Sequence, residues 1–171
     1  MRSVVFVCHG NIMRSASAAE FLREDLKTAG IDDVRVSSAG THARNGKAAD
    51  ARVRQTAAEM GVNLDHHRAT LLTADIVDAN DVIFAMDEFN FANIATEFPR
   101  SRGKLMLFGG MNPDGVYRPH EIADPYMTGQ AQVAATIGVV RRYVAALAVA
   151  LAKRQTGDPA AASEAARRGR S

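Results

Sequence analysis

The sequence predicts an α/β fold: a single-domain, three-layer sandwich in which a four-stranded parallel sheet carries helices on both faces. Four short apolar runs alternate along the chain with segments of helical periodicity, and such an alternation builds parallel sheets with two covered faces. The chain has 171 residues, of which 47% are hydrophobic and 23% charged, which suits one globular domain. We expect the strand order 2-1-3-4 and place the domain at residues 1–153.

The first half of the chain supplies two strands and two helices. An apolar run ends at Cys8, and the helix after it has apolar residues at helical spacing and ends near Gly30. Ser17 and Glu20 have the spacing of a capping box at the start of this helix. The predicted elements are strand 3–8, a helix from about residue 15, strand 34–37 and helix 50–60.

The second half continues the alternation with strands 81–86 and 104–108 and helices 88–97 and 130–153. Pro99 ends the first of these helices, because proline cannot continue one. The last helix has an apolar stripe on one face, formed by Val133, Ile137, Val140, Val144, Leu147 and Leu151. Residues 154–171 are rich in Ala, Arg, Gly and Ser, and we expect them to form a disordered tail.

Composition limits the surroundings and the partners. A formal net charge of +2 is too small to indicate a nucleic-acid partner. The N-terminal apolar run is too short for a signal-peptide core and the C-terminal one too short for a membrane span. A single cysteine excludes an internal disulfide and fits a reducing compartment. We therefore expect a cytoplasmic monomer with no membrane insertion.

The most informative segment is the loop between the first strand and the first helix, which reads Cys-His-Gly-Asn-Ile-Met-Arg-Ser over residues 8–15. A helix start offers unpaired backbone N–H groups and the positive end of a helix dipole to an anion. Gly10 allows close approach of the backbone, Asn11 tolerates a left-handed turn, and Arg14 can hold two phosphoryl oxygens. The same donors favour the thiolate form of Cys8, and Ser15 is placed to donate a hydrogen bond to it.

Polar residues follow three of the predicted strands. Cys8 ends the first strand, Asp87 follows the third, and Asp124 lies in the loop after the fourth. Ligands of open parallel sheets bind in the crevice at the carboxyl ends of the strands. The three side chains are therefore predicted to converge on one site.

Other interpretations of these residues stay open. Cys8 could be a small buried core residue with Arg14 as a surface charge. The loop could also hold the phosphate of a nucleotide or flavin, although such a loop needs neither cysteine nor arginine at these positions. Asp124 precedes a proline, as residues at turn starts commonly do. Asp87 could simply be the N-cap of the next helix.

From about residue 3 to residue 153 the chain resembles the low-molecular-weight protein tyrosine phosphatases. The similarity rests on five segments: the loop at 7–15, Ser-Ala-Gly-Thr at 38–41, His-Arg-Ala at 67–69, Met-Asp at 86–87 with Asn90, and Asp-Pro-Tyr at 124–126. Segments 103–109 and 122–126 are most similar to the bacterial, exopolysaccharide-associated enzymes. The resemblance implies hydrolysis of phosphotyrosine in proteins, with a bacterial tyrosine kinase as the expected partner and no metal or cofactor.

The resemblance also implies a role for each matching residue. Cys8 is expected to attack phosphorus and form a phosphocysteine, while Asp124 protonates the leaving phenolate oxygen and then activates water. Arg14 and the loop amides are expected to hold the phosphoryl oxygens. The expected phosphate-binding residues are His9, Gly10, Asn11, Ile12, Met13, Arg14 and Ser15.

Three further sets of residues have supporting roles by the same resemblance. The residues expected to hold the loop at 8–15, here called the phosphate loop, in place are Asn11, Ser15 and Ser38. The residues expected to line the slot for an aromatic phosphoester are Ile12, Arg44, Tyr126 and Met127. The residues that match a buried polar pair of the family are His67 and Asp87.

Three alternative functions remain beside tyrosine phosphatase activity. Arsenate reduction on the same fold passes oxidation to further cysteines, and Met13 stands where many relatives carry a second one. Phosphoarginine phosphatases tend to have a small polar residue where this chain has the bulky Ile12. A silent phosphate- or phosphopeptide-binding module is the alternative from a different class, although all three expected catalytic residues are present.

Overall fold

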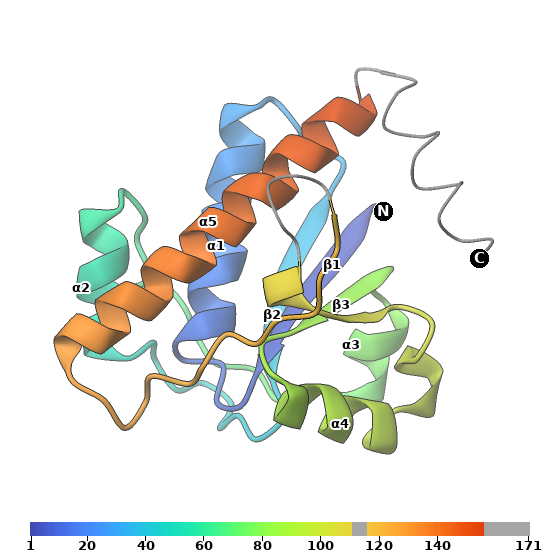
Figure 1. Ribbon diagram of the computed structural model, residues 1–171, viewed down its shortest axis with the longest axis horizontal. Helices are drawn as coiled ribbons and strands as arrows, with labels where there is room; N and C mark the ends of the chain where they lie inside the picture. The colour runs from blue at the N-terminus through green and yellow to red at the C-terminus, as the bar shows by residue number, and fades with distance from the viewer. Residues whose placement is uncertain (111–115, 156–171) are drawn as a thin grey trace.

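The computed structural model describes residues 1–110 and 116–155 (Figure 1). Its centre is a four-stranded parallel sheet in the order β2-β1-β3-β4, which confirms the predicted order. The strands are β1 (Ser3–Cys8), β2 (Arg35–Gly40), β3 (Val82–Ala85) and β4 (Leu105–Leu107). The helices are α1 (Arg14–Thr28), α2 (Ala51–Glu59), α3 (Ala74–Asp78), α4 (Glu88–Glu97) and α5 (Gln130–Gln155), with 3-10 turns η1 (Pro99–Ser101) and η2 (Phe108–Gly110).

Strand β1 is buried along its whole length, and its alternate residues serve two separate cores. Val4 and Phe6 pack with apolar residues of α1, α2 and α5, whereas Val5 and Val7 pack with those of α3 and α4. Figure 1 shows the two groups of helices on opposite sides of the sheet. Because successive side chains of a strand point to opposite faces, a central parallel strand needs apolar residues at every position. The three-layer sandwich predicted from the sequence is confirmed.

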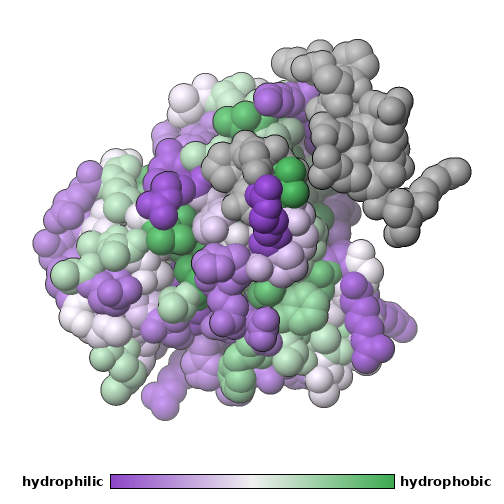
Figure 2. All heavy atoms as spheres, in the orientation of Figure 1, coloured by the Kyte–Doolittle hydropathy of each residue, from purple (hydrophilic) through white to green (hydrophobic). Residues whose placement is uncertain are grey.

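Helix α5 closes one face of the sheet. Its predicted stripe from Val133 to Leu151 is buried, and Arg141 forms two hydrogen bonds of 2.7 and 2.8 Å with Asp25 of α1. In the described part of the chain, α5 is also the one helix long and apolar enough to span a membrane. Figure 2 shows hydrophilic side chains interspersed with apolar ones over the face that α5 crosses. This pattern is typical of a helix that contributes one side to a protein core.

The ends of several elements differ from the predictions; strand β2, for example, ends at Gly40 instead of residue 37. Helix α1 starts at Arg14 with Met13 as a cap that forms no side-chain hydrogen bond, so the capping box predicted at Ser17 is wrong. Ser17 instead lies inside the first turn, where its hydroxyl donates to the carbonyls of Met13 and Arg14. Helix α5 continues through Gln155, and the rest of the predicted tail, 156–171, lies outside the described residues.

Candidate active site

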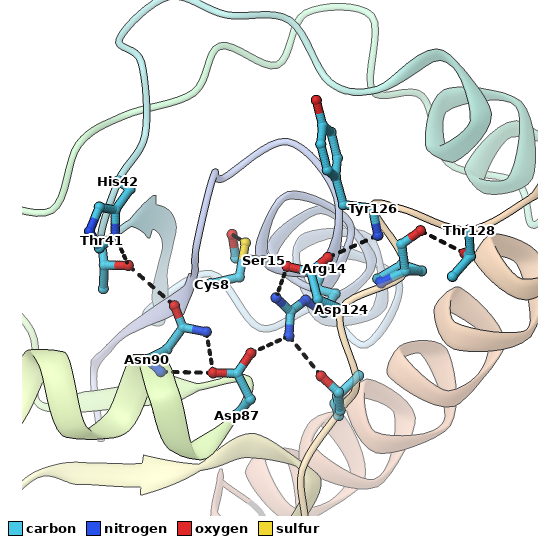
Figure 3. Close-up of polar contacts among 12 residues, drawn as sticks. Cys8, Arg14, Ser15, Thr41, His42, Asp87, Asn90, Asp124, Tyr126 and Thr128 are labelled. Atoms are coloured by element: carbon cyan, nitrogen blue, oxygen red, sulfur yellow. Dashed lines mark hydrogen bonds and ion pairs between the residues drawn. The ribbon is translucent and has the colours of Figure 1, made fainter.

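The carboxyl edge of the sheet collects the segments that carry the predicted site. Cys8 ends β1 opposite Gly40, the last residue of β2. Beside β1, the N–H of Met86 donates to the carbonyl of Val7 at 3.0 Å, and the N–H of Ile122 donates to the carbonyl of Met86 at 2.7 Å. These bonds bring the segment after β4 alongside the end of β3. Cys8, Arg14, Asp87 and Asp124 consequently lie together, as Figure 3 shows.

The loop after Cys8 is held in an unusual conformation through Asn11. Asn11 has a φ of 52°, in the left-handed region that asparagine tolerates better than most residues. Its side-chain oxygen accepts from the N–H of Thr70 at 2.9 Å, and its amide nitrogen donates to the hydroxyl of Ser15 at 2.9 Å. The Nε2 of His67 lies 2.7 Å from the Asn11 carbonyl. Residues 11–15 are buried, whereas His9 is exposed.

Cys8 is buried at the base of this loop, and its sulfur lies 3.0 Å from the hydroxyl oxygen of Ser15. Because that hydroxyl already accepts the Asn11 amide, its own proton is left for the sulfur or for the Ala39 carbonyl at 3.2 Å. Ser15 therefore lies where it can donate to a thiolate.

Arg14 is 1% exposed and connects the site's separate segments. One terminal nitrogen donates to Asp87 at 2.6 Å and to the Ile122 carbonyl at 2.7 Å, and the other donates to Asp124 at 2.5 Å. Burial alone would lower the pKa of Arg14, but the charges of Cys8, Asp124 and Asp87 outweigh it and raise that pKa.

The Nε–H of Arg14 is buried and has no hydrogen-bond partner in the part of the chain that the structure describes. An unpaired buried N–H is costly, so such groups in native proteins usually mark a functional site or a missing acceptor. A phosphoryl oxygen is an acceptor that suits a guanidinium edge. The site therefore fits an anion, although Asp124 now occupies the neighbouring N–H.

Asp87 performs two structural tasks at once. It is the N-cap of α4, since one carboxylate oxygen accepts from both the backbone and the side-chain nitrogen of Asn90, and its other oxygen holds Arg14. Asn90 in turn accepts from the hydroxyl of Thr41 at 3.3 Å. His67 bonds to the loop carbonyl instead, so the predicted polar pair of His67 and Asp87 does not form. The burial of His67 lowers its pKa.

Asp124 is fixed by its own turn as well as by Arg14. The second carboxylate oxygen accepts from the N–H of Tyr126 at 3.0 Å, two residues further on, which is the geometry of an Asx turn. The side chain remains 41% exposed. The carboxylate therefore lies beside the edge of Arg14 that carries the Nε–H left unpaired among the described residues, with access to solvent.

The predicted slot residues surround the site unequally. Ile12 is buried, Arg44 is exposed, Tyr126 is 47% exposed and Met127 is 89% exposed. The Nζ of Lys47 lies 6.0 Å from the centroid of the Tyr126 ring. Tyr126 is thus available as a wall, whereas the side chain of Met127 lies almost entirely in solvent.

An aromatic cluster that was not predicted lies beside the loop. The rings of His9 and His42 stack with centroids 4.5 Å apart, and the ring of Phe89 lies 6.3 and 6.4 Å from them. In Figure 3, His42 and Tyr126 lie on opposite sides of Cys8. The only sequence signal was His9 inside the loop motif, because the other two rings come from the turn after β2 and from α4.

We expected Ser38 to hold the loop in place. In the structure the contacts with the loop come from Ala39 and Gly40 instead. Ser38 pairs with Phe6 in the sheet, and in the described structure its hydroxyl forms no hydrogen bond with the loop. The Ala39 carbonyl contacts Ser15 instead. At Gly40 a Cβ atom would lie 2.6 Å from the His9 carbonyl oxygen and 2.8 Å from the Asn11 nitrogen. Only glycine permits this close approach.

The fold and the loop together define a class of protein, an α/β domain whose loop between a strand and a helix start is suited to an anion, with a cysteine at its base. The family model described as "Low molecular weight phosphotyrosine protein phosphatase" matches residues 3–156. This match covers most of the chain. The chain therefore belongs to the low-molecular-weight phosphotyrosine protein phosphatase family, as its sequence motifs predicted.

Individual relatives agree with this assignment. The low-molecular-weight protein-tyrosine-phosphatase Etp of Escherichia coli K12 is 36% identical over 140 residues, which cover 82% of this chain and 88% of Etp. The crystal structure of the tyrosine phosphatase AmsI of Erwinia amylovora has 33% identity and a TM-score of 0.74, covering 85% of this chain and 89% of AmsI. The YwlE arginine phosphatase of Geobacillus stearothermophilus has 25% identity and a TM-score of 0.82, covering 92% of this chain and 97% of YwlE.

Proposed function

We propose that the protein hydrolyses phosphotyrosine monoesters in proteins through a phosphocysteine intermediate on Cys8. The observation that carries the proposal is the meeting of Cys8, Arg14 and Asp124 at one edge of the sheet, where the Nε–H of Arg14 has no acceptor among the described residues. The family match and the names of Etp and AmsI support the reaction and the substrate class.

In the first step the phosphoryl oxygens accept hydrogen bonds from the loop amides and from the guanidinium of Arg14. The sulfur of Cys8 attacks phosphorus, so that an S–P bond forms while the bond from phosphorus to the tyrosine oxygen breaks. Asp124, protonated at this stage, gives its proton to the departing phenolate oxygen. The free tyrosine side chain then leaves.

In the second step Asp124, now a carboxylate, takes a proton from water whose oxygen attacks phosphorus. The S–P bond breaks, inorganic phosphate is released, and the Cys8 thiolate is restored. The hydroxyl of Ser15, 3.0 Å from the sulfur, is placed to donate to that thiolate as it departs. The net reaction consumes one phosphomonoester and one water and gives one phenol and one phosphate.

The surroundings of the loop favour an aromatic ester over phosphoarginine. Tyr126 and the His9–His42–Phe89 cluster offer ring faces on either side of Cys8, and aromatic rings pack well against a phenyl group. The similarity to YwlE raises phosphoarginine as the second candidate. Ile12, bulky and buried in the loop, stands where such enzymes tend to have a small polar residue.

Phosphate release from matched peptides tests the proposal directly. With two peptides that differ only in carrying phosphotyrosine or phosphoarginine, we expect kcat/KM to favour phosphotyrosine by about tenfold or more, because the ring contacts are lost with phosphoarginine. A preference for phosphoarginine would overturn the substrate class. Tight binding of both peptides without phosphate release would instead show a silent binding module.

We further propose that the enzyme acts as a monomer in the cytoplasm on a phosphotyrosine protein, such as a bacterial tyrosine kinase of an exopolysaccharide system. A lone free cysteine as nucleophile needs a reducing compartment, and the names of the bacterial relatives support the substrate class. A Cys8→Ser variant that retains phosphotyrosine proteins from a lysate, and releases them with vanadate, would support a phosphotyrosine protein as the substrate. Retention that vanadate leaves unchanged would contradict that substrate class.

A further inference from the structure

The start of helix α2 contacts the phosphate loop on one side and the segment that carries Asp124 on the other. Asp50 is the N-cap of α2, where its carboxylate accepts from the N–H of Arg52 at 2.9 Å. The backbone N–H of the same Asp50 donates to the carbonyl of Ile12 in the phosphate loop, also at 2.9 Å. Asp50 therefore connects the start of α2 directly to the loop that follows Cys8.

The guanidinium of Arg52 is held in one orientation by this cap. Its Nε and one terminal nitrogen donate to the two carboxylate oxygens of Asp50, each at 2.9 Å. A bidentate pair of this kind fixes the plane of the guanidinium as well as its position. The hydrogen bond from Arg52 is the main reason why the pKa of Asp50 is lowered, and the pKa of Arg52 is raised in return.

The outer edge of the Arg52 guanidinium contacts the segment of the predicted acid. It donates to the carbonyl of Thr128 at 2.6 Å and to the carbonyl of Tyr126 at 3.1 Å. The N–H of the same Tyr126 donates to the carboxylate of Asp124 at 3.0 Å. Tyr126 is thus bonded through its backbone to Asp124 at one end and to Arg52 at the other.

We propose that Arg52 is a positioning residue for the proton donor. Together with Asp50 it fixes the spacing between the phosphate loop and the segment 124–128, and so keeps the Asp124 carboxylate beside the Arg14 edge where the leaving oxygen would lie. This inference rests on the proposed acid role of Asp124. In the described structure Arg52 forms no hydrogen bond with Arg14 or Cys8, so it acts on the chemistry only through Asp124.

Such a contact matters more for rate than for stability. The Arg52 side chain is 31% exposed and that of Asp50 is 16% exposed, and ion pairs near the surface contribute little to folding stability. A displacement of a catalytic group by about 1 Å, in contrast, can cost about 10²-fold in rate.

The leaving-group dependence of kcat/KM, which reports the steps up to formation of the phosphocysteine and not its later hydrolysis, separates positioning of the acid from a general structural defect. Phenyl phosphate needs protonation of its leaving oxygen, whereas 2,4-dinitrophenyl phosphate leaves without it. For Asp124→Asn we expect a loss of about 10²–10⁴-fold on phenyl phosphate and a much smaller loss on the dinitrophenyl ester. For Arg52→Ala we expect the same pattern at about 10- to 100-fold, with the inhibition constant for inorganic phosphate little changed.

Arg54→Ala is the matched control, because Arg54 lies on the same helix and pairs with exposed Asp65 at 3.0 Å, away from the site. It should leave both esters unaffected. Arg52→Lys keeps a positive charge beside Asp50 but lacks the guanidinium edge that donates to the carbonyls of Tyr126 and Thr128. Its loss of kcat/KM should therefore be smaller than that of Arg52→Ala, with the same leaving-group pattern. The lysine variant also keeps the test available should the alanine variant unfold.

Two results would overturn the inference: an unchanged kcat/KM for phenyl phosphate in Arg52→Ala, or an equal loss of kcat/KM on both esters. If Asp124→Asn shows the leaving-group pattern and the Arg52 variants do not, only the positioning role fails. If Asp124→Asn itself loses both esters equally, the acid role in the proposed function fails as well.

Discussion

Arg14 is the residue through which the three parts of the site meet. It belongs to the phosphate loop, yet it donates to Asp87 after β3 and to Asp124 after β4. A buried guanidinium needs acceptors for its N–H groups. The two carboxylates and the Ile122 carbonyl supply three, and among the described residues the Nε–H has none. The same requirement that stabilises Arg14 therefore places the Asp124 carboxylate beside the Nε–H of Arg14.

His67 makes the stability of the loop depend on pH. Its pKa is lowered by burial, so the folded protein holds the ring neutral below the unfolded value of about 6.5. Between the folded and unfolded pKa values the unfolded chain binds more protons, and stability must fall as pH drops through that interval. We expect thermal stability to decrease from pH 7 to pH 5, and to decrease less in His67→Gln. Parallel melting curves for the two proteins would contradict this.

At the residue scale, the sequence identified side chains that each belong to a recognisable local motif. It missed those that come together from distant segments without such a motif. Cys8, Arg14 and Asp124 stand in recognisable patterns, and the structure brings them together. His42 and Phe89 lie in no motif and acquire a role only by packing beside His9. The contact of Arg52 with Tyr126 spans 74 residues of sequence, so no local pattern indicates it.

At the element scale, the end of β2 supports the phosphate loop as directly as the loop's own residues do. Gly40 ends β2 where Cys8 ends β1, and the two chains approach so closely that a Cβ has no room. Its carbonyl and N–H also bond to the 70–72 segment, which reaches back to Asn11. The loop is therefore held between two parts of the chain outside the motif.

Two glycine substitutions should have opposite effects. Gly40→Ala places a methyl group against the backbone of His9 and Asn11, so it should destabilise the protein by about 1–3 kcal/mol and reduce kcat. Gly138→Ala lies in helix α5 with open space around it, so it should stabilise by about 0.5–1 kcal/mol without affecting kcat. Chemical denaturation and turnover of an aryl phosphate measure both. Equal effects at the two positions would contradict the close approach at Gly40.

The ends of elements were predicted well wherever a side chain sets them. Asp87 caps α4 and Pro99 follows its end, and the helix runs over residues 88–97 as predicted. Helix α1 begins within one residue of its predicted start, but the predicted capping box at Ser17 does not form, because the loop leads into the helix without a capping side chain. The short helix α3 was not predicted, since five residues are too few to show a periodic pattern.

At the scale of the whole molecule, the parallel sheet turns a linear order of motifs into a site. Each strand delivers its following loop to the same edge, so residues 8, 87 and 124 meet although more than a hundred positions separate the first from the last. This convergence was predictable from the alternation of strands and helices. The detailed packing around the edge was not, because it depends on contacts among loops rather than on periodicity.

The central claim is that Cys8 carries the phosphoryl group during turnover. The most direct test is an acid quench of the protein while it hydrolyses an aryl phosphate, followed by mass spectrometric location of the bound phosphoryl group. We expect one phosphoryl group on Cys8 in the wild-type protein and in Asp124→Asn, and no turnover by Cys8→Ser. A fully active Cys8→Ser protein, with no phosphorylated Cys8 in either of the others, would contradict the account.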